Sequence, residues 1–263
     1  MPGHRRAAPD RAAPNHAGAH FLRDAALISR LAGGSGAGDG RLVLDLGAGY
    51  GSITAALAGT GARVIAIERD PRLAGRLSRR FAADPRVRVV TADIRRVPLP
   101  RREFLVVASL PFAVTTAMSR RLLGDPGVPL AGAELITAWG AGCWLAHPRP
   151  RDEETAWWTA RYLVRLAGRV PARSFAPPPG VDAAWLSVRP RPITRSPAGQ
   201  RVLRALLRDA FRGDKRCGEP PNVARTALLR AGIAPGTPAR ELTAAQWHRL
   251  ALQLAAAEDF RLA

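Results

Sequence analysis

The sequence predicts an α/β protein with a doubly wound parallel sheet, followed by a small C-terminal helical domain. The first observation is a continuous apolar run, Leu42–Leu46, that ends in the glycine-rich segment 47–51. Such a run is typical of a buried parallel strand followed by a tight turn into a helix. The second observation is the alternation of strand and helix patterns as far as residue 138, which indicates an open doubly wound sheet. The third is the proline-containing segment 190–197, after which only helical patterns remain.

Recognisable start and stop signals bound the elements of this sheet. A first helix begins after Asp24, a preferred N-cap residue, and ends in the glycine-rich loop 32–40. Asp70-Pro71 combines an N-cap with a proline at the first helical position and predicts the start of another helix. Further strands are expected over residues 63–67, 87–90, 104–108 and 133–138, with a helix over 114–123.

The signal is weaker after Pro148. The stretch HPRPRDEE, residues 147–154, is predicted to be a polar loop, and SFAPPPGVD, residues 174–182, a rigid proline-rich turn. Strands are expected over 162–166 and 184–188, and helices over about 199–212, 222–231 and 240–257. The predicted division of the chain is a basic flexible arm, 1–18, a sheet domain, 19–190, and a helical domain, 191–263.

The charge of the chain predicts a polyanionic partner. Forty Lys and Arg residues oppose 21 Asp and Glu residues, a formal net charge of +19, and solubility alone does not require such a charge. All the cations but Lys215 are Arg, whose planar fork binds phosphate and stacks on bases. A GC-rich genome would also favour Arg. On the predicted helix after Pro71, Arg72, Arg76, Arg79 and Arg80 recur at helical spacing, and we interpret them as a surface that follows phosphates rather than an ordinary solvated face.

Cysteine usage and hydropathy indicate a cytoplasmic protein. Cys143 and Cys217 are far apart, with no C-x-x-C pair, which excludes a disulfide framework and the usual zinc spacings. The first twenty residues lack the apolar core of a signal peptide, and no run is long and apolar enough to span a membrane. We therefore expect no metal, no secretion and no membrane insertion.

Residues suited to binding a nucleoside stand at the ends of three successive predicted strands. The G-x-G-x-G segment 47–51 lets backbone approach an anionic ligand, and its spacing differs from the G-x-G-x-x-G of dinucleotide dehydrogenases. Glu68 ends the second strand, where its carboxylate can accept hydrogen bonds from ribose hydroxyls, and Asp93 follows the third, where it can accept one from an adenine amino group. Taken singly, these residues could be a tight turn, a solvated acid or a helix N-cap. Together they predict a nucleoside-binding crevice.

The fourth strand ends in Ser109-Leu110-Pro111-Phe112. An adenine N6 is a poor nucleophile, so a site that methylates it needs acceptors for the amino hydrogens and an aromatic face for the base. A hydroxyl, a backbone carbonyl beside a proline and an aromatic ring supply these parts within four residues. The alternative is a strand that ends in a proline turn with a buried Phe.

These residues, with further segments, resemble the ribosomal RNA adenine-N6 methyltransferases over roughly residues 15–190. The segments that carry the resemblance are His20–Asp24, Leu44–Gly51, Ile67–Asp70, Ala92-Asp93, Ser109–Phe112 and Phe175–Asp182. Within this superfamily, Asn15-His16, His20–Leu22 and the Arg-rich composition look like the macrolide-resistance (Erm) branch, which modifies 23S rRNA. The small-subunit dimethyladenosine transferases are the near alternative.

The resemblance implies a Rossmann-like methyltransferase sheet that uses S-adenosyl-L-methionine. It places the cofactor against His20, Leu22, Gly47, Gly49, Glu68, Asp93 and Ser109. It places the target adenine against Ser109, Leu110, Pro111, Phe112 and Phe175, with the two Phe rings on either side of the base. The expected function is therefore methyl transfer to an adenine N6 in protein-free or pre-ribosomal 23S rRNA by a monomeric enzyme, which confers macrolide-type resistance.

The chain departs from the family pattern at three places. Ala19 stands where the family has Gln, Ser109 where it usually has Asn, and Ala138–Leu145 replaces the usual Gln and basic residues. The departures leave open a catalytically degenerate relative retained for RNA binding or ribosome assembly. A nicotinamide oxidoreductase is disfavoured by the glycine spacing. We interpret the six Trp residues as core or domain-junction side chains, although Trp139 follows a strand end near the expected site.

Overall fold

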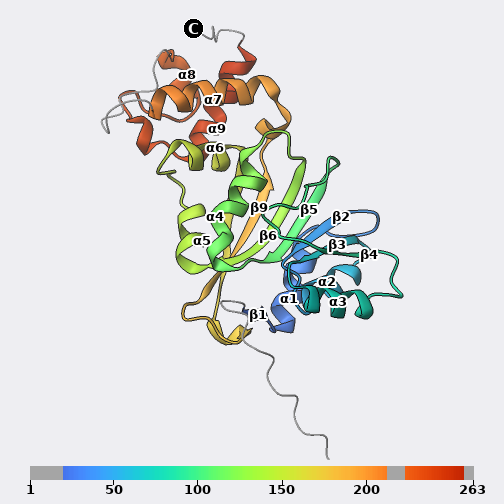
Figure 1. Ribbon diagram of the computed structural model, residues 1–263. Coiled ribbons are helices and arrows are strands. Elements are labelled where there is room, and N and C mark those ends of the chain that lie inside the picture. Colours follow the sequence, from blue (N-terminus) through green and yellow to red (C-terminus); the bar gives the residue numbers. More distant parts are fainter. Residues whose placement is uncertain (1–19, 212–222, 258–263) are drawn as a thin grey trace, which may run out of the picture.

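The structure, a computed structural model, describes residues 20–211 and 223–257 and contains one large mixed sheet (Figure 1). The predicted basic arm, 1–18, lies outside the described residues. Seven strands pair in the order β4-β3-β2-β5-β6-β9-β7. The strands are β2 (Leu42–Leu46), β3 (Arg63–Glu68), β4 (Val87–Thr91), β5 (Phe104–Ser109), β6 (Leu130–Ala138), β7 (Tyr162–Val170) and β9 (Ala183–Pro190). The first five in this order are parallel, whereas β9 runs antiparallel to both of its neighbours.

The predicted helix starts are confirmed by their caps. The Asp24 carboxylate accepts a hydrogen bond from the Leu27 backbone nitrogen at 3.0 Å, and Asp70 accepts from those of Arg72 and Leu73 at 2.7 and 3.2 Å. The helices of the described residues are α1 (Ala25–Gly34), α2 (Ser52–Ala58), α3 (Pro71–Arg80), α4 (Thr115–Ser119), α5 (Trp139–Leu145), α6 (Glu153–Arg161), α7 (Pro197–Phe211), α8 (Arg225–Arg230) and α9 (Ala244–Ala256). None of these helices is long and apolar enough to cross a membrane.

The central strands are buried on both faces, which confirms the doubly wound fold. Successive side chains of a strand point to opposite faces of the sheet. Accordingly, Leu44 packs in one core cluster with α6, α7 and α9, whereas its neighbour Val43 packs in a second cluster with α1 and α2. A continuous apolar run such as Leu42–Leu46 is the pattern that this environment requires.

Two helices, α5 and α6, were not predicted. Residues 147–154 were predicted to be a loop, but Glu153 and Glu154 already belong to α6. The start of α6 is fixed by a capping box, because the Asp152 carboxylate accepts from the Thr155 nitrogen at 2.8 Å while the Thr155 hydroxyl accepts from the Asp152 nitrogen.

The predicted helix over 114–123 is present in a modified form. A 3₁₀ turn, Phe112–Val114, leads into α4, which continues as a π-helical turn, Arg120–Gly124. The last carbonyls of this π-helical turn accept hydrogen bonds from side chains of α6. Arg161 Nη1 donates to the Leu123 oxygen and Trp157 Nε1 to the Gly124 oxygen, both at 2.7 Å. These long-range bonds satisfy carbonyls that a helix end leaves open.

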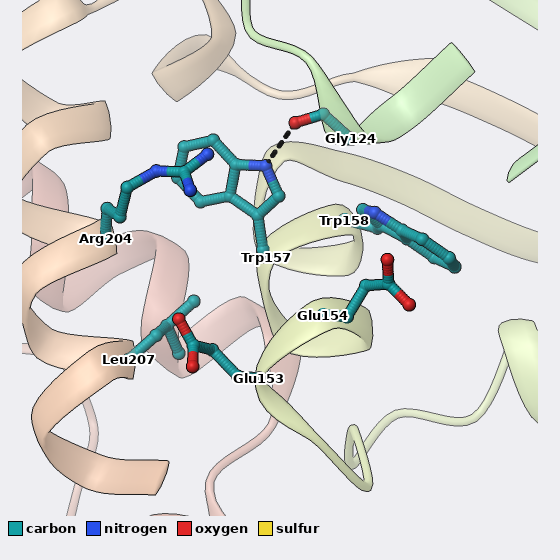
Figure 2. A pocket seen from close by; sticks show the side chains of 7 residues that line it. All are labelled: Gly124, Glu153, Glu154, Trp157, Trp158, Arg204 and Leu207. Atoms are coloured by element: carbon teal, nitrogen blue, oxygen red, sulfur yellow. Dashed lines mark hydrogen bonds between the residues drawn. The ribbon is translucent and has the colours of Figure 1, made fainter. Parts of the chain in front are cut away.

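The helix α6 lies with α7, α8 and α9 at one end of the sheet, whereas α1, α2 and α3 lie at the other (Figure 1). The Trp157 ring joins α6 to α7, because the guanidinium carbon of Arg204 in α7 lies 4.2 Å from its centroid. Arg161, one turn further along α6, lies 4.6 Å from the same centroid. Figure 2 shows Trp157 with Arg204 and Gly124, which line a cavity of about 290 Å³. The boundary at residue 190 stays a prediction.

Candidate active site

The strand order reverses between β2 and β5, which places a crevice at the carboxyl ends of these two strands. From β2 the chain adds β3 and then β4 on one side, and it returns to add β5 and β6 on the other. Ligands of open α/β sheets bind at such a switch point. The Gly47 turn after β2 lies beside the end of β5, since a Cβ atom on Gly47 would be 3.8 Å from Pro111 Cδ and 3.9 Å from the Ser109 oxygen.

The glycine turn is held by the neighbouring strand β3. The Gly47 and Ala48 nitrogens both donate to the Ile67 oxygen, at 2.9 and 3.0 Å. Gly47 and Gly49 have positive φ values, 81° and 53°, which only glycine adopts without strain. A Cβ atom on Gly49 would also lie 2.8 Å from the Phe21 ring. Backbone geometry therefore requires glycine at both positions, and the space beside Phe21 requires it at Gly49 as well.

The Glu68 carboxylate lies directly under this turn. It is buried, and its two oxygens accept from the Gly49 and Asp70 nitrogens, both at 2.9 Å. Each oxygen of an ionised carboxylate has a second lone pair. Glu68 thus fixes the glycine turn and the entry to α3 and keeps acceptor capacity for a further donor.

Asp93 is brought close to Glu68, because the Ala92 nitrogen donates to the Glu68 oxygen at 3.0 Å. Its carboxylate is partly exposed and forms an ion pair with Arg95, at 2.6 Å between Oδ2 and Nη2. The hydrogen bonds from Arg95 lower the pKa of Asp93 to about 2. The carboxylate is therefore ionised at neutral pH and is a strong acceptor.

The segment Ser109–Phe112 forms the other wall of the crevice. Leu110 is buried and its nitrogen donates to the Ile136 oxygen of β6 at 2.9 Å, while Ser109 and Phe112 are half-buried. The His20 ring lies 6.0 Å from the Phe112 ring and is held by a 2.9 Å hydrogen bond between Nδ1 and the Pro177 oxygen. The segment that begins at His20 thus reaches the wall of the crevice that Ser109–Phe112 forms.

Phe175 lies in a different environment from Phe112. It belongs to β8 (Phe175–Ala176), which pairs with β1 (Phe21–Leu22) so that Leu22 stands opposite Phe175. Both side chains are buried, with exposed fractions of 5% for Leu22 and 4% for Phe175. The structure brings the predicted residues to one edge of the sheet, but only Phe112 of the two predicted stacking rings is accessible.

Two residues near the crevice were not singled out from the sequence. Phe21 packs on the glycine turn, with its ring 4.6 Å from the Tyr50 ring in an edge contact. Asp45 is buried in β2, where Oδ2 accepts from the Thr54 hydroxyl at 2.6 Å and Oδ1 has no partner. Burial raises the pKa of Asp45 to about 7. An acid inside the apolar run Leu42–Leu46 is the sequence signal that could have identified it.

The described residues contain no group of three or more His, Cys, Asp or Glu side chains that could hold a metal ion. The four Arg residues of α3, Arg72, Arg76, Arg79 and Arg80, are all exposed, opposite the buried Leu73 and Leu77. This face of α3 is consequently a cationic surface close to the glycine turn, to which Arg80 donates a 2.6 Å hydrogen bond at the Tyr50 oxygen.

A protein-family model described as ribosomal RNA adenine dimethylase matches residues 13–256, nearly the whole chain. The chain belongs to this family. Membership supports, at the level of the family, the predictions of a methyltransferase that uses S-adenosyl-L-methionine and acts on rRNA. The predicted Rossmann-like sheet is confirmed as well.

Curated relatives fall into two groups. An rRNA adenine N-6-methyltransferase of Bacillus licheniformis is 26% identical over 175 residues, which cover 66% of this chain and 61% of that protein. A ribosomal RNA small subunit methyltransferase A of Gloeobacter violaceus is 33% identical over 201 residues, 74% of this chain and 73% of that protein. Among solved structures, the 23S rRNA methyltransferase ErmE superimposes with a TM-score of 0.75 at 26% identity, over 89% of this chain and 99% of ErmE.

Proposed function

We propose that this chain transfers a methyl group from S-adenosyl-L-methionine to the N6 amino group of an adenine in 23S rRNA, and that the modification confers resistance to macrolide-type antibiotics. The observation that carries the chemistry is the meeting of Gly47 with Ser109 and Pro111 at the switch point of the sheet. The choice of 23S rRNA is supported by the similarity to ErmE over almost the full length of both chains. The proposed site of action is the cytoplasm and the proposed enzyme is a monomer.

On the cofactor side, we assign the ribose to Glu68 and the adenine amino group to Asp93, because both carboxyl groups offer hydrogen-bond acceptors at neighbouring strand ends. Gly47 and Gly49 leave backbone without side chains where the methionine end approaches. His20 and Leu22 belong to the segment that lies over this turn, and we assign them to the methionine end of the cofactor as well. When bound, S-adenosyl-L-methionine supplies an electrophilic methyl group.

On the target side, we assign the amino group to the Ser109 hydroxyl and the Leu110 carbonyl, with Pro111 fixing the turn and Ser109 also facing the cofactor. Phe112 is half-buried and offers the first stacking face. Phe175 is 4% exposed, so its face takes part only when the paired segment β1–β8 shifts as RNA enters.

No strong base is required in this arrangement. Holding the amino nitrogen in line with the methyl group supplies much of the acceleration, and the amino proton leaves to solvent after the new bond forms. A stacked adenine cannot reach the crevice, so the base must be unpaired or flipped out of its RNA. The exposed Arg residues of α3 are suited to the phosphates of that RNA.

A small-subunit dimethyladenosine transferase is the second candidate. The 33% identity to the Gloeobacter violaceus small-subunit enzyme favours it. The two candidates share cofactor, fold and chemistry, and they differ only in the RNA that is methylated. A catalytically degenerate relative, the third alternative, would bind RNA but would not transfer a methyl group.

Substitutions at Ser109 and Phe112 distinguish an active enzyme from an RNA binder. Ser109→Ala should lower methyl transfer to protein-free 23S rRNA and leave RNA affinity nearly unchanged, because phosphate contacts dominate binding. Ser109→Asn should preserve or raise methyl transfer, since an amide oxygen is an acceptor with no hydrogen of its own to rotate out of the way. Phe112→Ala should lose about 1–3 kcal/mol of base stacking.

The assay is incorporation of tritiated methyl groups, followed by nucleoside analysis for N6-methyladenine. If the wild type binds cofactor and RNA but incorporates no methyl groups, the proposal that the chain is an active methyltransferase is refuted. Normal activity of Ser109→Ala would instead refute only the role of the serine.

A further inference from the structure

A second surface cavity lies beside the target side of the crevice. It has a volume of about 390 Å³ and is lined by Trp139, Arg169, Ala172, Gly180, Val181 and Asp182. This volume is within the range of pockets that hold small ligands, about 300–1,000 Å³. Trp139 directly follows β6, the strand in which Ile136 pairs with Ser109 of β5. The cavity is thus one strand away from the residue assigned to the target amino group.

A preformed aromatic and cationic stack forms one wall of this cavity. The Arg169 guanidinium carbon lies 5.0 Å from the centroid of the Trp139 ring. Asp182 holds both partners, because its Oδ2 accepts from Arg169 Nε at 2.7 Å and its backbone oxygen accepts from the Trp139 nitrogen at 3.1 Å. Its Oδ1 accepts from the Ala172 nitrogen at 2.8 Å, which anchors the carboxylate itself. The stack therefore needs no rearrangement to receive a planar ligand.

The charges of the cavity favour a base over a phosphate. Asp182 is ionised, since the bonds from Ala172 and Arg169 lower its pKa, and it neutralises the Arg169 guanidinium. Arg169 is nevertheless 63% exposed at its side chain, and Val181, an apolar residue, is 54% exposed. A flat Trp–Arg surface with an apolar neighbour and little net charge suits the π-face of a nucleobase.

We propose that this cavity binds a second unpaired base of the RNA, adjacent to the target adenine in the strand. This inference rests on the proposed function, in which an adenine of RNA enters the crevice. Phe175 and Asp182 lie on the segment that joins β7 to β9, so one segment contributes to both base sites. The Trp139 platform thereby favours RNA in which the nucleotide next to the adenine is also unpaired, whichever base it carries.

The test compares short single-stranded RNA probes that differ in one base. One probe has a single adenine between abasic positions, and two others add one base on its 5′ or its 3′ side. For the wild type saturated with S-adenosyl-L-methionine, fluorescence anisotropy should show about 5- to 150-fold tighter binding when the base is added on one of the two sides, the usual contribution of one stacked base.

Trp139→Ala should abolish this gain, and Trp139→Phe should restore part of it. The matched control is Arg165→Ala, because Arg165 is an exposed Arg of the same strand, β7, that does not line the cavity. It should lower the affinity for all probes alike and keep the gain. Calorimetric cofactor binding verifies that each variant is folded.

Equal binding of the three probes by the wild type, or a full gain in Trp139→Ala, would overturn the inference. Absence of methyl transfer to rRNA would refute the proposed function instead, and it would leave this binding comparison intact.

Discussion

The cofactor side of the crevice and the junction with the C-terminal helices are built in different ways. At the crevice, each strand carries its functional residue at its own end, as Glu68 does on β3, and the parallel sheet aligns these ends. At the junction, Trp157 of α6 is held by Gly124 and by Arg204 of α7, which come from distant parts of the chain. Local sequence therefore specifies the first region, and long-range packing specifies the second.

The largest expected effect is on the junction. Trp157→Ala should lower the free energy of unfolding by about 3–5 kcal/mol, the usual cost of removing a buried aromatic side chain. Cofactor affinity of the folded protein should not change, because α6, which carries Trp157, is at the opposite end of the sheet from α2, which follows the glycine turn (Figure 1). Urea unfolding and calorimetric titration measure the two quantities.

Trp157→Phe is the matched variant at this position. It keeps a ring beside the two guanidinium groups but removes the donor to the Gly124 oxygen and part of the buried indole. Its cost should be at least the roughly 1–3 kcal/mol of the lost hydrogen bond and less than the cost of Trp157→Ala. Loss of cofactor binding in either folded variant would show that the two regions are not independent.

The same contrast explains how much the sequence could predict. The strand β2, the glycine turn and the Asp24 and Asp70 caps were predicted because apolar runs and capping residues act locally. The helix α6 was missed because prolines at 148 and 150 obscured its start, although Asp152 and Thr155 form a capping box. The burial of Phe175 could not be predicted, since it depends on pairing with Leu22, far away in the chain.

At the crevice, Gly49→Ala should damage cofactor binding. Alanine at the positive φ of 53° is strained, and its Cβ would lie 2.8 Å from the Phe21 ring. The two costs together are about 2–4 kcal/mol, or about 30- to 1,000-fold in affinity by calorimetry if all of it appears in binding. Gly140→Ala is the control, because nothing lies within 4 Å of its Cβ position. Unchanged affinity in Gly49→Ala would mean that the turn does not hold the cofactor.

A smaller effect is expected from Asp45, the buried acid within β2. The pKa of Asp45 is about 7 in the folded protein and about 3.9 in an unfolded chain, so the folded state retains a proton that the unfolded chain releases. Stability from this group therefore falls as the pH rises from about 4 to 7. Asp45→Asn removes the titration, and its stability relative to the wild type should increase by about 2 kcal/mol between pH 5 and 8.

Thermal unfolding at both pH values measures this difference. Burial also lowers the pKa of His248, which gives a pH dependence of opposite sign, but His248 is present in both proteins and cancels. A constant difference between Asp45→Asn and the wild type across this pH range would show that Asp45 is ionised in the folded state.

We propose that the crevice methylates an adenine N6 in 23S rRNA. Mapping N6-methyladenine in both ribosomal RNAs, from cells with and without the chain, tests it most directly. The expected result is one adenine of 23S rRNA that is methylated only when the wild-type chain is present, and that loses much of this methylation with Ser109→Ala. Methylation confined to 16S rRNA, or no new methyladenine in either RNA, would contradict the claim.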